Sequence, residues 1–157
     1  MKASSLNEIK NELNESSNTR LIALCLRLAK YKKENKELLT YLLYQAHDEQ
    51  SYIENIKVEI NTAFEDINLS NNYYIKKSLR KILRNTNKHI KYSSIAQTEV
   101  ELLIYFCQKI KASDIVIDAT QALHNIYLNQ LKRIKDAMAK LHEDLQYDYN
   151  KELETLK

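Results

Sequence analysis

The sequence predicts an all-α fold of six or seven antiparallel helices. None of the 157 residues is glycine or proline, although average usage would supply about eleven glycines and eight prolines. Tight turns with positive φ, β-bulges and phosphate-cradling loops all depend on glycine. Apolar residues also recur every three or four positions through most of the chain, which is the spacing of one helix face. We therefore expect either an irregular helical bundle or a short helix-pair superhelix of the armadillo or HEAT type.

Length and composition favour one folded, soluble domain over residues 1–157. The chain is 44% hydrophobic and 29% charged, so it has enough apolar content to form a core. Its longest apolar cluster, Leu21–Ala29, contains Arg27 and is too short to span a bilayer. No signal-peptide pattern opens the chain. We expect a cytoplasmic protein without a membrane span, in which Cys25 and Cys107 are buried, reduced thiols.

Capping signals divide the first half of the chain into three expected helices. Ser5 and Glu8 form the pattern of a capping box, which opens a short first helix. Helical apolar spacing then covers about residues 19–44 and, after a polar joint, about residues 48–68.

The second half contains three further expected helices. A basic helix covers about residues 71–92, and Ser94 with Gln97 forms a second capping-box pattern before a helix that runs to Ile110. After a short connection, helical spacing extends over residues 118–157, which predicts one long C-terminal helix with an end that projects from the domain.

Heptad spacing marks this long helix. Its apolar positions alternate in steps of four and three, and they are Tyr127, Leu131, Ile134, Met138, Leu141 and Leu145. A continuous helix of this length would span about 60 Å at about 1.5 Å per residue, which exceeds the width of a compact domain of this size. It is then either the longest helix of a bundle or a coiled-coil contact to a second copy. We take the six residues as the predicted oligomer contact.

The most distinctive electrostatic feature is a basic stripe on the expected helix 73–92. No acidic residue lies between Asp66 and Glu99. At about 100° per residue, seven basic side chains fall within an arc of about 140°. This basic stripe consists of Lys76, Lys77, Arg80, Lys81, Arg84, Lys88 and Lys91, with Tyr73 among the charges. The opposite face is apolar and is expected to face the core through Ile75, Leu79, Ile82, Leu83, Thr86 and Ile90.

The basic stripe has several interpretations. The polar face of an amphipathic helix in a lysine-rich chain can simply be solvated. Seven like charges nevertheless repel one another, and an anionic partner would offset that repulsion. An acidic protein surface, the acidic segment that follows Glu143, and nucleic acid each fit this description. A nucleic acid would be bound without sequence preference, because only two of the seven residues are arginine. A membrane surface is less favoured, since the apolar face lacks aromatic bulk.

The patterns of common catalytic and metal sites are missing. No histidine follows a glutamate by three positions, as a dimetal bundle requires. His142 and Glu143 are not followed by the second histidine of a zincin motif, and the two cysteines are far apart. We therefore expect no metal, no cofactor, no small-molecule substrate and no enzymatic activity. The favoured function is a non-catalytic protein-interaction module, an adaptor or scaffold; the alternative is nonspecific nucleic-acid binding through residues 73–92.

Three segments together resemble a family of small, uncharacterised bacterial helical proteins. They are Leu24–Leu39, Leu79–Lys88 and Leu141–Tyr149. The resemblance runs over nearly the whole chain and implies a soluble bacterial protein. It implies no activity, cofactor or catalytic residue.

Overall fold

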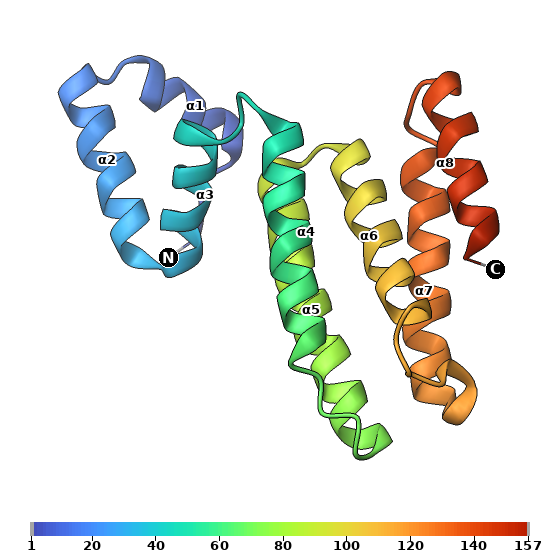
Figure 1. Ribbon diagram of the computed structural model, residues 1–157. Helices are drawn as coiled ribbons and strands as arrows, with labels where there is room; N and C mark the ends of the chain where they lie inside the picture. Colours follow the sequence, from blue (N-terminus) through green and yellow to red (C-terminus); the bar gives the residue numbers. More distant parts are fainter. Residues whose placement is uncertain (1, 157) are drawn as a thin grey trace. The chain divides into compact units, whose positions relative to one another are not determined.

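The computed structural model describes residues 2–156, and these residues form an all-α structure without a strand (Figure 1). They contain eight α-helices and one short 3-10 helix, namely α1 (Leu6–Asn14), α2 (Asn18–Tyr31), α3 (Lys33–Tyr44), α4 (Glu49–Glu65), α5 (Asn72–Ser93), α6 (Ala96–Lys111), η1 (Ile117–Ala119), α7 (Gln121–Met138) and α8 (Glu143–Thr155). The predicted all-α class is confirmed. No helix among the described residues combines the length and apolar character needed to cross a membrane.

The chain divides into two compact units. The first ends at Tyr44 and contains α1, α2 and α3, of which α2 and α3 pack together. The second begins at Gln45 and contains the remaining helices and nearly all of the buried apolar side chains. The single domain expected over residues 1–157 stays a prediction, and each unit is described by itself.

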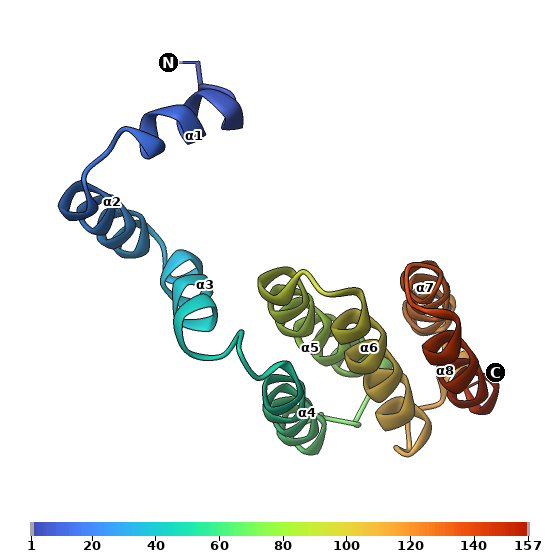
Figure 2. The ribbon, with the colours of Figure 1, turned by 90° about the horizontal axis from the view of Figure 1, so that it is seen from above.

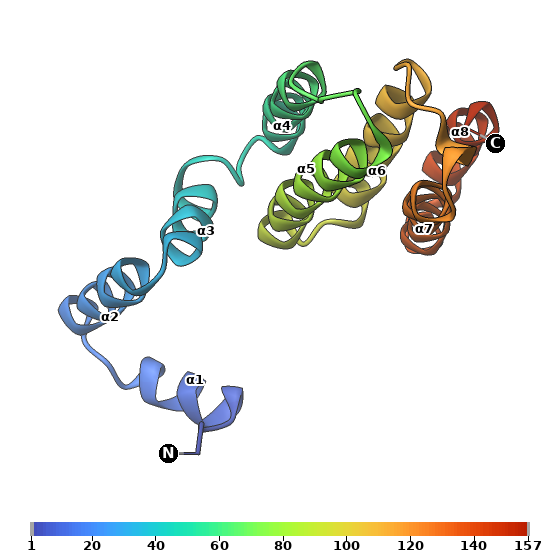
Figure 3. The ribbon, with the colours of Figure 1, turned by 90° about the horizontal axis from the view of Figure 1, so that it is seen from below.

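The second unit consists of two layers of helices. Helices α4, α6 and α8 lie in one layer, and α5 and α7 lie in the other (Figures 2 and 3). Consecutive helices run antiparallel (Figure 1). Helix α6 is central, because it contacts α4, α5, α7 and α8. Half of its sixteen residues are buried, and Phe106 among them packs edge-on against Phe64 of α4, with ring centroids 5.6 Å apart.

The chain has more helices than the expected six or seven, because two expected helices are each divided. The first division lies at Lys32, which takes an extended conformation (φ −141°, ψ 149°) between α2 and α3. The side-chain amide of Asn35 donates a hydrogen bond of 2.9 Å to the carbonyl oxygen of Leu28. It thereby satisfies one of the carbonyls left free at the end of α2. In many proteins a left-handed glycine after the helix allows backbone N–H groups to bond such carbonyls, and here a polar side chain bonds one instead.

The prediction of one long helix over residues 118–157 is wrong. Helix α7 ends at Met138, and α8 begins at Glu143. His142 caps α8, since its ring Nδ1 accepts a hydrogen bond from the Asp144 backbone N–H at 3.3 Å. Glu143 and Asp144 then lie in the first turn of a helix, where the helix dipole favours negative charge. These acids would be unfavourable near the C-terminal end of a single long helix, and the break removes that conflict.

Both cysteines are free thiols, but only one is buried. Burial raises the pKa of Cys107 from 9.0 to about 12, so its thiol stays neutral at physiological pH. The prediction of burial is confirmed for Cys107 and wrong for Cys25, which is exposed on α2. The apolar neighbours of Cys25 along the sequence suggested a core position, but no residue of α2 is buried.

The first capping box is confirmed, and the second is wrong. Ser5 and Glu8 bond reciprocally at the start of α1, through distances of 3.3 and 2.7 Å. Ser94, in contrast, ends α5 in the left-handed conformation (φ 56°, ψ 18°), and α6 starts after Ile95 without a side-chain cap. The reversal between the antiparallel helices α5 and α6 takes place at this left-handed residue. In a chain without glycine, a serine occupies it.

Replacing Ser94 with glycine is expected to stabilise the protein by about 0.5–1 kcal/mol, because glycine enters the left-handed conformation without the steric cost of a Cβ atom. The comparison is a Ser78→Gly variant, in which the same change falls inside α5 and is expected to destabilise by about 0.5 kcal/mol. Urea unfolding followed by circular dichroism measures both. Equal destabilisation by the two changes would contradict the left-handed conformation at Ser94.

Candidate anion-binding surface on helix α5

Helix α5 is firmly held in the second unit. The side chain of Asn71 caps its start by accepting hydrogen bonds from the backbone N–H groups of Tyr73 and Tyr74, at 3.0 and 3.1 Å. At its other end, Ser93 and Thr98 both donate hydrogen bonds to the carboxylate of Glu49 on α4. The helix is therefore capped at its start and bonded to α4 at its end.

The apolar face of α5 lies where the sequence predicts it. All six expected core residues are buried, namely Ile75, Leu79, Ile82, Leu83, Thr86 and Ile90. They belong to a helix that contacts α4, α6 and α7. Thr86 is compatible with the core because its hydroxyl donates a hydrogen bond of 3.0 Å to the carbonyl oxygen of Ile82. The helix accordingly continues through the polar sequence at residues 85–87.

The basic stripe occupies the remaining face of α5. Five of its members are exposed, and they are Lys77, Arg80, Lys81, Arg84 and Lys91. Lys76 and Lys88 are half-buried at its edges. Tyr73 is 61% exposed, and its ring lies 6.0 Å from the Lys76 ammonium group. The structure therefore brings all eight predicted residues onto one continuous helix.

The exposed cations of the basic stripe are not neutralised within the described chain. None of the five exposed members forms an ion pair with any of residues 2–156. Glu59 of α4 contacts α5 outside the basic stripe: it accepts a hydrogen bond from Asn85 at 3.2 Å and lies 3.6 Å from the His89 ring. Glu99 pairs with Arg133 at 2.7 Å. The result is a row of positive charges exposed to solvent.

The acidic C-terminal segment has other contacts in the same chain. Helix α8 packs against α6 and α7, away from α5 (Figures 1 and 2). Asp148 lies 3.7 Å from the ammonium group of Lys151, and Glu152 accepts a hydrogen bond from Gln108 at 3.4 Å. This places α8 in the layer that does not contain the basic stripe.

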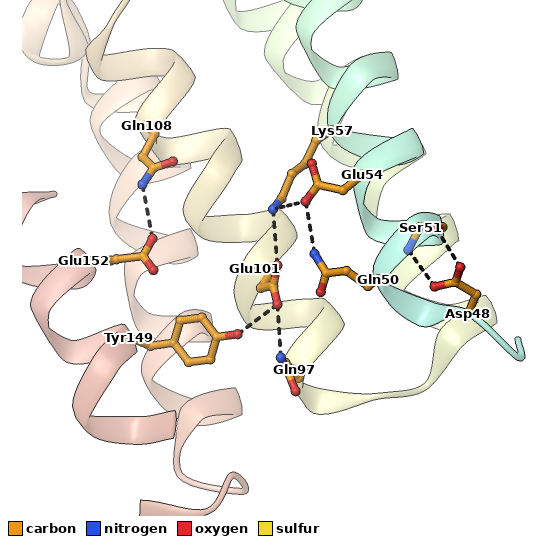
Figure 4. A network of polar contacts seen from close by, with 10 residues as sticks. All are labelled: Asp48, Gln50, Ser51, Glu54, Lys57, Gln97, Glu101, Gln108, Tyr149 and Glu152. Carbon is orange, nitrogen blue, oxygen red and sulfur yellow. Dashed lines mark hydrogen bonds and ion pairs between the residues drawn. The ribbon is translucent and has the colours of Figure 1, made fainter. Parts of the chain in front are cut away.

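A second cluster of titratable side chains joins three helices around Glu101 (Figure 4). The Glu101 carboxylate accepts hydrogen bonds from Lys57 of α4 at 3.2 Å, from Tyr149 of α8 at 2.9 Å and from Gln97 of α6 at 3.1 Å. Its side chain is only 12% exposed. We call these four residues the Glu101 cluster, and its hydrogen bonds connect all three helices of one layer.

The charges of the Glu101 cluster follow from its hydrogen bonds. Burial opposes the charge on Lys57, but hydrogen bonds to Glu54 and Glu101 outweigh it and raise the pKa of Lys57. Burial, and then the hydrogen bond to Glu101, raise the pKa of Tyr149 above its usual 10.0. At neutral pH, Lys57 is therefore charged and Tyr149 is a neutral donor. The other three groups all donate hydrogen bonds to Glu101, so the cluster holds the three helices together.

Sequence reasoning missed the Glu101 cluster, because Lys57 and Tyr149 lie 44 and 48 residues away from Glu101. No local spacing pattern marks such a set. Among residues 2–156, no group of three or more histidine, cysteine, aspartate or glutamate side chains is placed to hold a metal ion.

The predicted oligomer contact is divided among α7, which contains four of its residues, the connection that contains Leu141, and α8, which contains Leu145. Tyr127, Ile134 and Met138 are buried within the chain, and the Tyr127 hydroxyl donates a hydrogen bond of 2.6 Å to the carbonyl oxygen of Leu156. The other three residues are half-buried, and they are Leu131, Leu141 and Leu145. Packing inside one chain accounts for the apolar character of Tyr127, Ile134 and Met138. The oligomer contact through this surface stays a prediction.

Fold and surface together define an all-α protein with a rigidly held, exposed basic helix. Comparison with protein-family models, with curated proteins and with solved structures finds no match to this chain. The predicted relation to a family of small bacterial helical proteins therefore stays a prediction.

Proposed function

We propose that the protein is a non-catalytic interaction module that binds an anionic partner through the basic stripe of α5. The observation that carries this proposal is the row of exposed cations without ion pairs on a helix whose opposite face is buried. Like charges at i and i+4 repel each other, and each such pair costs a few tenths of a kcal/mol. A bound anionic surface offsets this repulsion.

Rigidity supports the proposal. Because the start of α5 is capped, its end is bonded to α4 and its apolar face is buried, the backbone that presents the cations is ordered before any partner binds. Binding then costs little backbone entropy, and only the lysine and arginine side chains become more ordered. The basic stripe extends from Lys76 to Lys91, a length of about 23 Å at about 1.5 Å per residue. An acidic surface of a partner protein is large enough to cover it.

The layered arrangement of the second unit supports an adaptor role. We infer that this unit is a short helix-pair stack of the armadillo or HEAT type, because its successive antiparallel helices lie alternately in one layer and in the other. Such stacks present long helical surfaces to partners. Helix α5 belongs to the layer that contains only α5 and α7.

Nonspecific nucleic-acid binding is the second candidate function. It is favoured by the position of α8, which leaves the basic stripe free of the acidic segment that could have covered it. Five of the seven basic residues are lysines, which contact phosphates as point charges and read bases poorly. Tyr73, which is exposed beside Lys76, is placed to stack on an unpaired base.

Fluorescence anisotropy tests the proposal with labelled polyglutamate and with random-sequence DNA and RNA oligonucleotides, at about 50 and about 200 mM salt. The test variant combines Lys77→Glu, Lys81→Glu and Arg84→Glu. We expect it to raise the Kd at least about tenfold and to lower the salt slope by about three, since each lost contact removes about one unit. Binding of polyglutamate alone favours a protein partner, and binding of the oligonucleotides favours the second candidate.

A control variant separates the basic stripe from net charge. It reverses three exposed lysines of α7 and its C-terminal end, and the changes are Lys132→Glu, Lys135→Glu and Lys140→Glu. Both variants have the same net charge, +3 − 6 = −3. We expect the control to retain most of the affinity. Equal losses in the two variants, or no binding of any probe by the unmodified protein at low salt, would contradict the proposed function.

A further inference from the structure

We propose that two copies of the chain associate through the first unit, with α1 of each copy lying antiparallel along α2 of the other. This inference does not depend on the basic stripe, which lies in the second unit. It starts from the exposed apolar side chains of the first unit and commits to a second copy as their partner.

The first unit leaves most of its apolar surface exposed. Tyr41 is its only large apolar side chain that is buried among the described residues, whereas eleven others are exposed. Neither α1 nor α2 contains a buried residue. A unit of about 40 residues is too small to be stable from its own core alone. Additional burial has to come from another surface.

Helix α2 presents one apolar flank that α3 leaves open. At about 100° per residue, Leu24, Leu28 and Tyr31 fall within an arc of about 60°, and their exposed fractions are 36%, 62% and 76%. Arg20 and Arg27 border this flank on one edge. Helix α2 contains no acidic residue at all. The matching surface is therefore an apolar helix face with acidic side chains along one edge.

Helix α1 has such a face. Leu6, Ile9 and Leu13 fall within about 60° of one another on its surface, and all three are exposed. Glu12 lies beside this apolar row, about 60° from Ile9. Helix α1 also has no extensive contact with any other described helix. Its apolar row and the Glu12 carboxylate are both exposed to a partner.

The two faces match in spacing when the helices run antiparallel. The apolar steps are three and four residues along α1 and four and three along α2, so they coincide when one helix is reversed. Ile9 then lies opposite Leu28. In this register, Glu12 lies on the same edge as Arg27, about 3 Å from its level along the axis. Apolar and charged positions are thus satisfied by one alignment.

The connection between α1 and α2 keeps α1 from covering the α2 flank of its own chain. Ser16 is bonded back to α1, through its backbone N–H to Leu13 at 3.1 Å and through its hydroxyl to Glu12 at 2.9 Å. This turn is not extended enough for α1 to reach along its own α2 in the stated register. In a two-fold symmetric dimer, the contact occurs twice, so that both copies bury α1 and the flank of α2.

Sedimentation velocity of the full chain over a range of micromolar concentrations tests the proposal. We expect the unmodified protein to dimerise and the Leu28→Glu variant to sediment as a monomer throughout, because a carboxylate would lie in the apolar seam. Leu28 is exposed, so this change removes no core packing from the chain. The control is Val58→Glu on α4, at a residue that is 65% exposed, and it should dimerise normally. A monomeric unmodified protein, or a dimer that survives Leu28→Glu, overturns the proposal.

A charge exchange tests the antiparallel register. Because the contact occurs twice in the dimer, Arg27→Glu and Glu12→Arg alone should each raise the dimer Kd by up to about 25-fold, which is about fivefold for each of the two exposed ion pairs lost. The two changes in one chain should bring the Kd back to within about twofold of the original, since an ion pair of opposite orientation forms. Additive weakening in the double variant overturns the register.

Discussion

Replacing Phe106 with alanine is expected to destabilise the protein by about 3–5 kcal/mol. Phe106 is completely buried in α6, the helix that contacts four others. The change removes the edge-on contact with Phe64 of α4 and leaves a cavity that the surrounding helices fill only in part. Since a domain of this size is stable by only about 5–15 kcal/mol, a large share of the total is lost.

Urea unfolding at equilibrium measures this loss through the change in midpoint at constant slope. The control is Tyr147→Ala, which removes an aromatic side chain that is 66% exposed. It should change the stability by about 0.5 kcal/mol or less. A loss below about 1 kcal/mol for Phe106→Ala would mean that α6 is not packed in the centre of the second unit.

Replacing Glu101 with alanine is expected to destabilise the protein by about 2–3 kcal/mol. The carboxylate accepts hydrogen bonds from Lys57, Tyr149 and Gln97, so its loss deprives three donors of their acceptor. The Tyr149 hydroxyl is affected most, because Tyr149 is buried. Lys57 retains its ion pair with Glu54 at 2.9 Å and is 21% exposed to solvent, which limits the penalty.

A matched control is available on the same ammonium group. Glu54 also pairs with Lys57, but its side chain is 56% exposed, so Glu54→Ala should cost about 0.5 kcal/mol at most. Thermal or urea unfolding of the two variants gives the difference. Equal effects of the two changes would contradict the burial of the Glu101 cluster.

The Glu101 cluster also has an expected alkaline signature. The folded-state pKa of Tyr149 is raised, so its contribution to stability is complete below the unfolded value near 10 and is lost as pH rises through the folded pKa. Burial is the larger cause of the shift and Glu101 the next. The loss of stability above pH 10 should therefore be less steep in Glu101→Ala than in the unmodified protein.

Local features of the chain were predictable. Helix α5 is the clearest case: the six core residues, the exposed basic stripe and the continuous helix all follow from the angular order of side chains along one amphipathic segment. The capping box of Ser5 and Glu8 is local in the same way, because both hydrogen bonds join residues three positions apart. Such features need no information about distant parts of the chain.

Helix ends were harder to predict in a chain without glycine or proline. At Lys32 and at His142, polar side chains cap the helix ends, and apolar periodicity continues across both breaks. Heptad steps from Tyr127 to Leu145 therefore indicated one helix where there are two. The acidic residues that follow His142 are the local signal that could have indicated the break, since negative charge is favourable at the start of a helix and unfavourable at its end.

The amino-acid sequence by itself determined that the protein is helical, which face of α5 is buried and where its positive charge gathers, because these properties depend on residues within a few turns of one another. Tertiary structure alone decided that α8 packs on α6 and α7, that Glu101 joins three helices, and that the five exposed members of the basic stripe form no ion pair with residues 2–156. Each of these outcomes depends on contacts between residues that are far apart in the chain. Different helices compete for the same surfaces in making such contacts, and no local sequence pattern encodes the result.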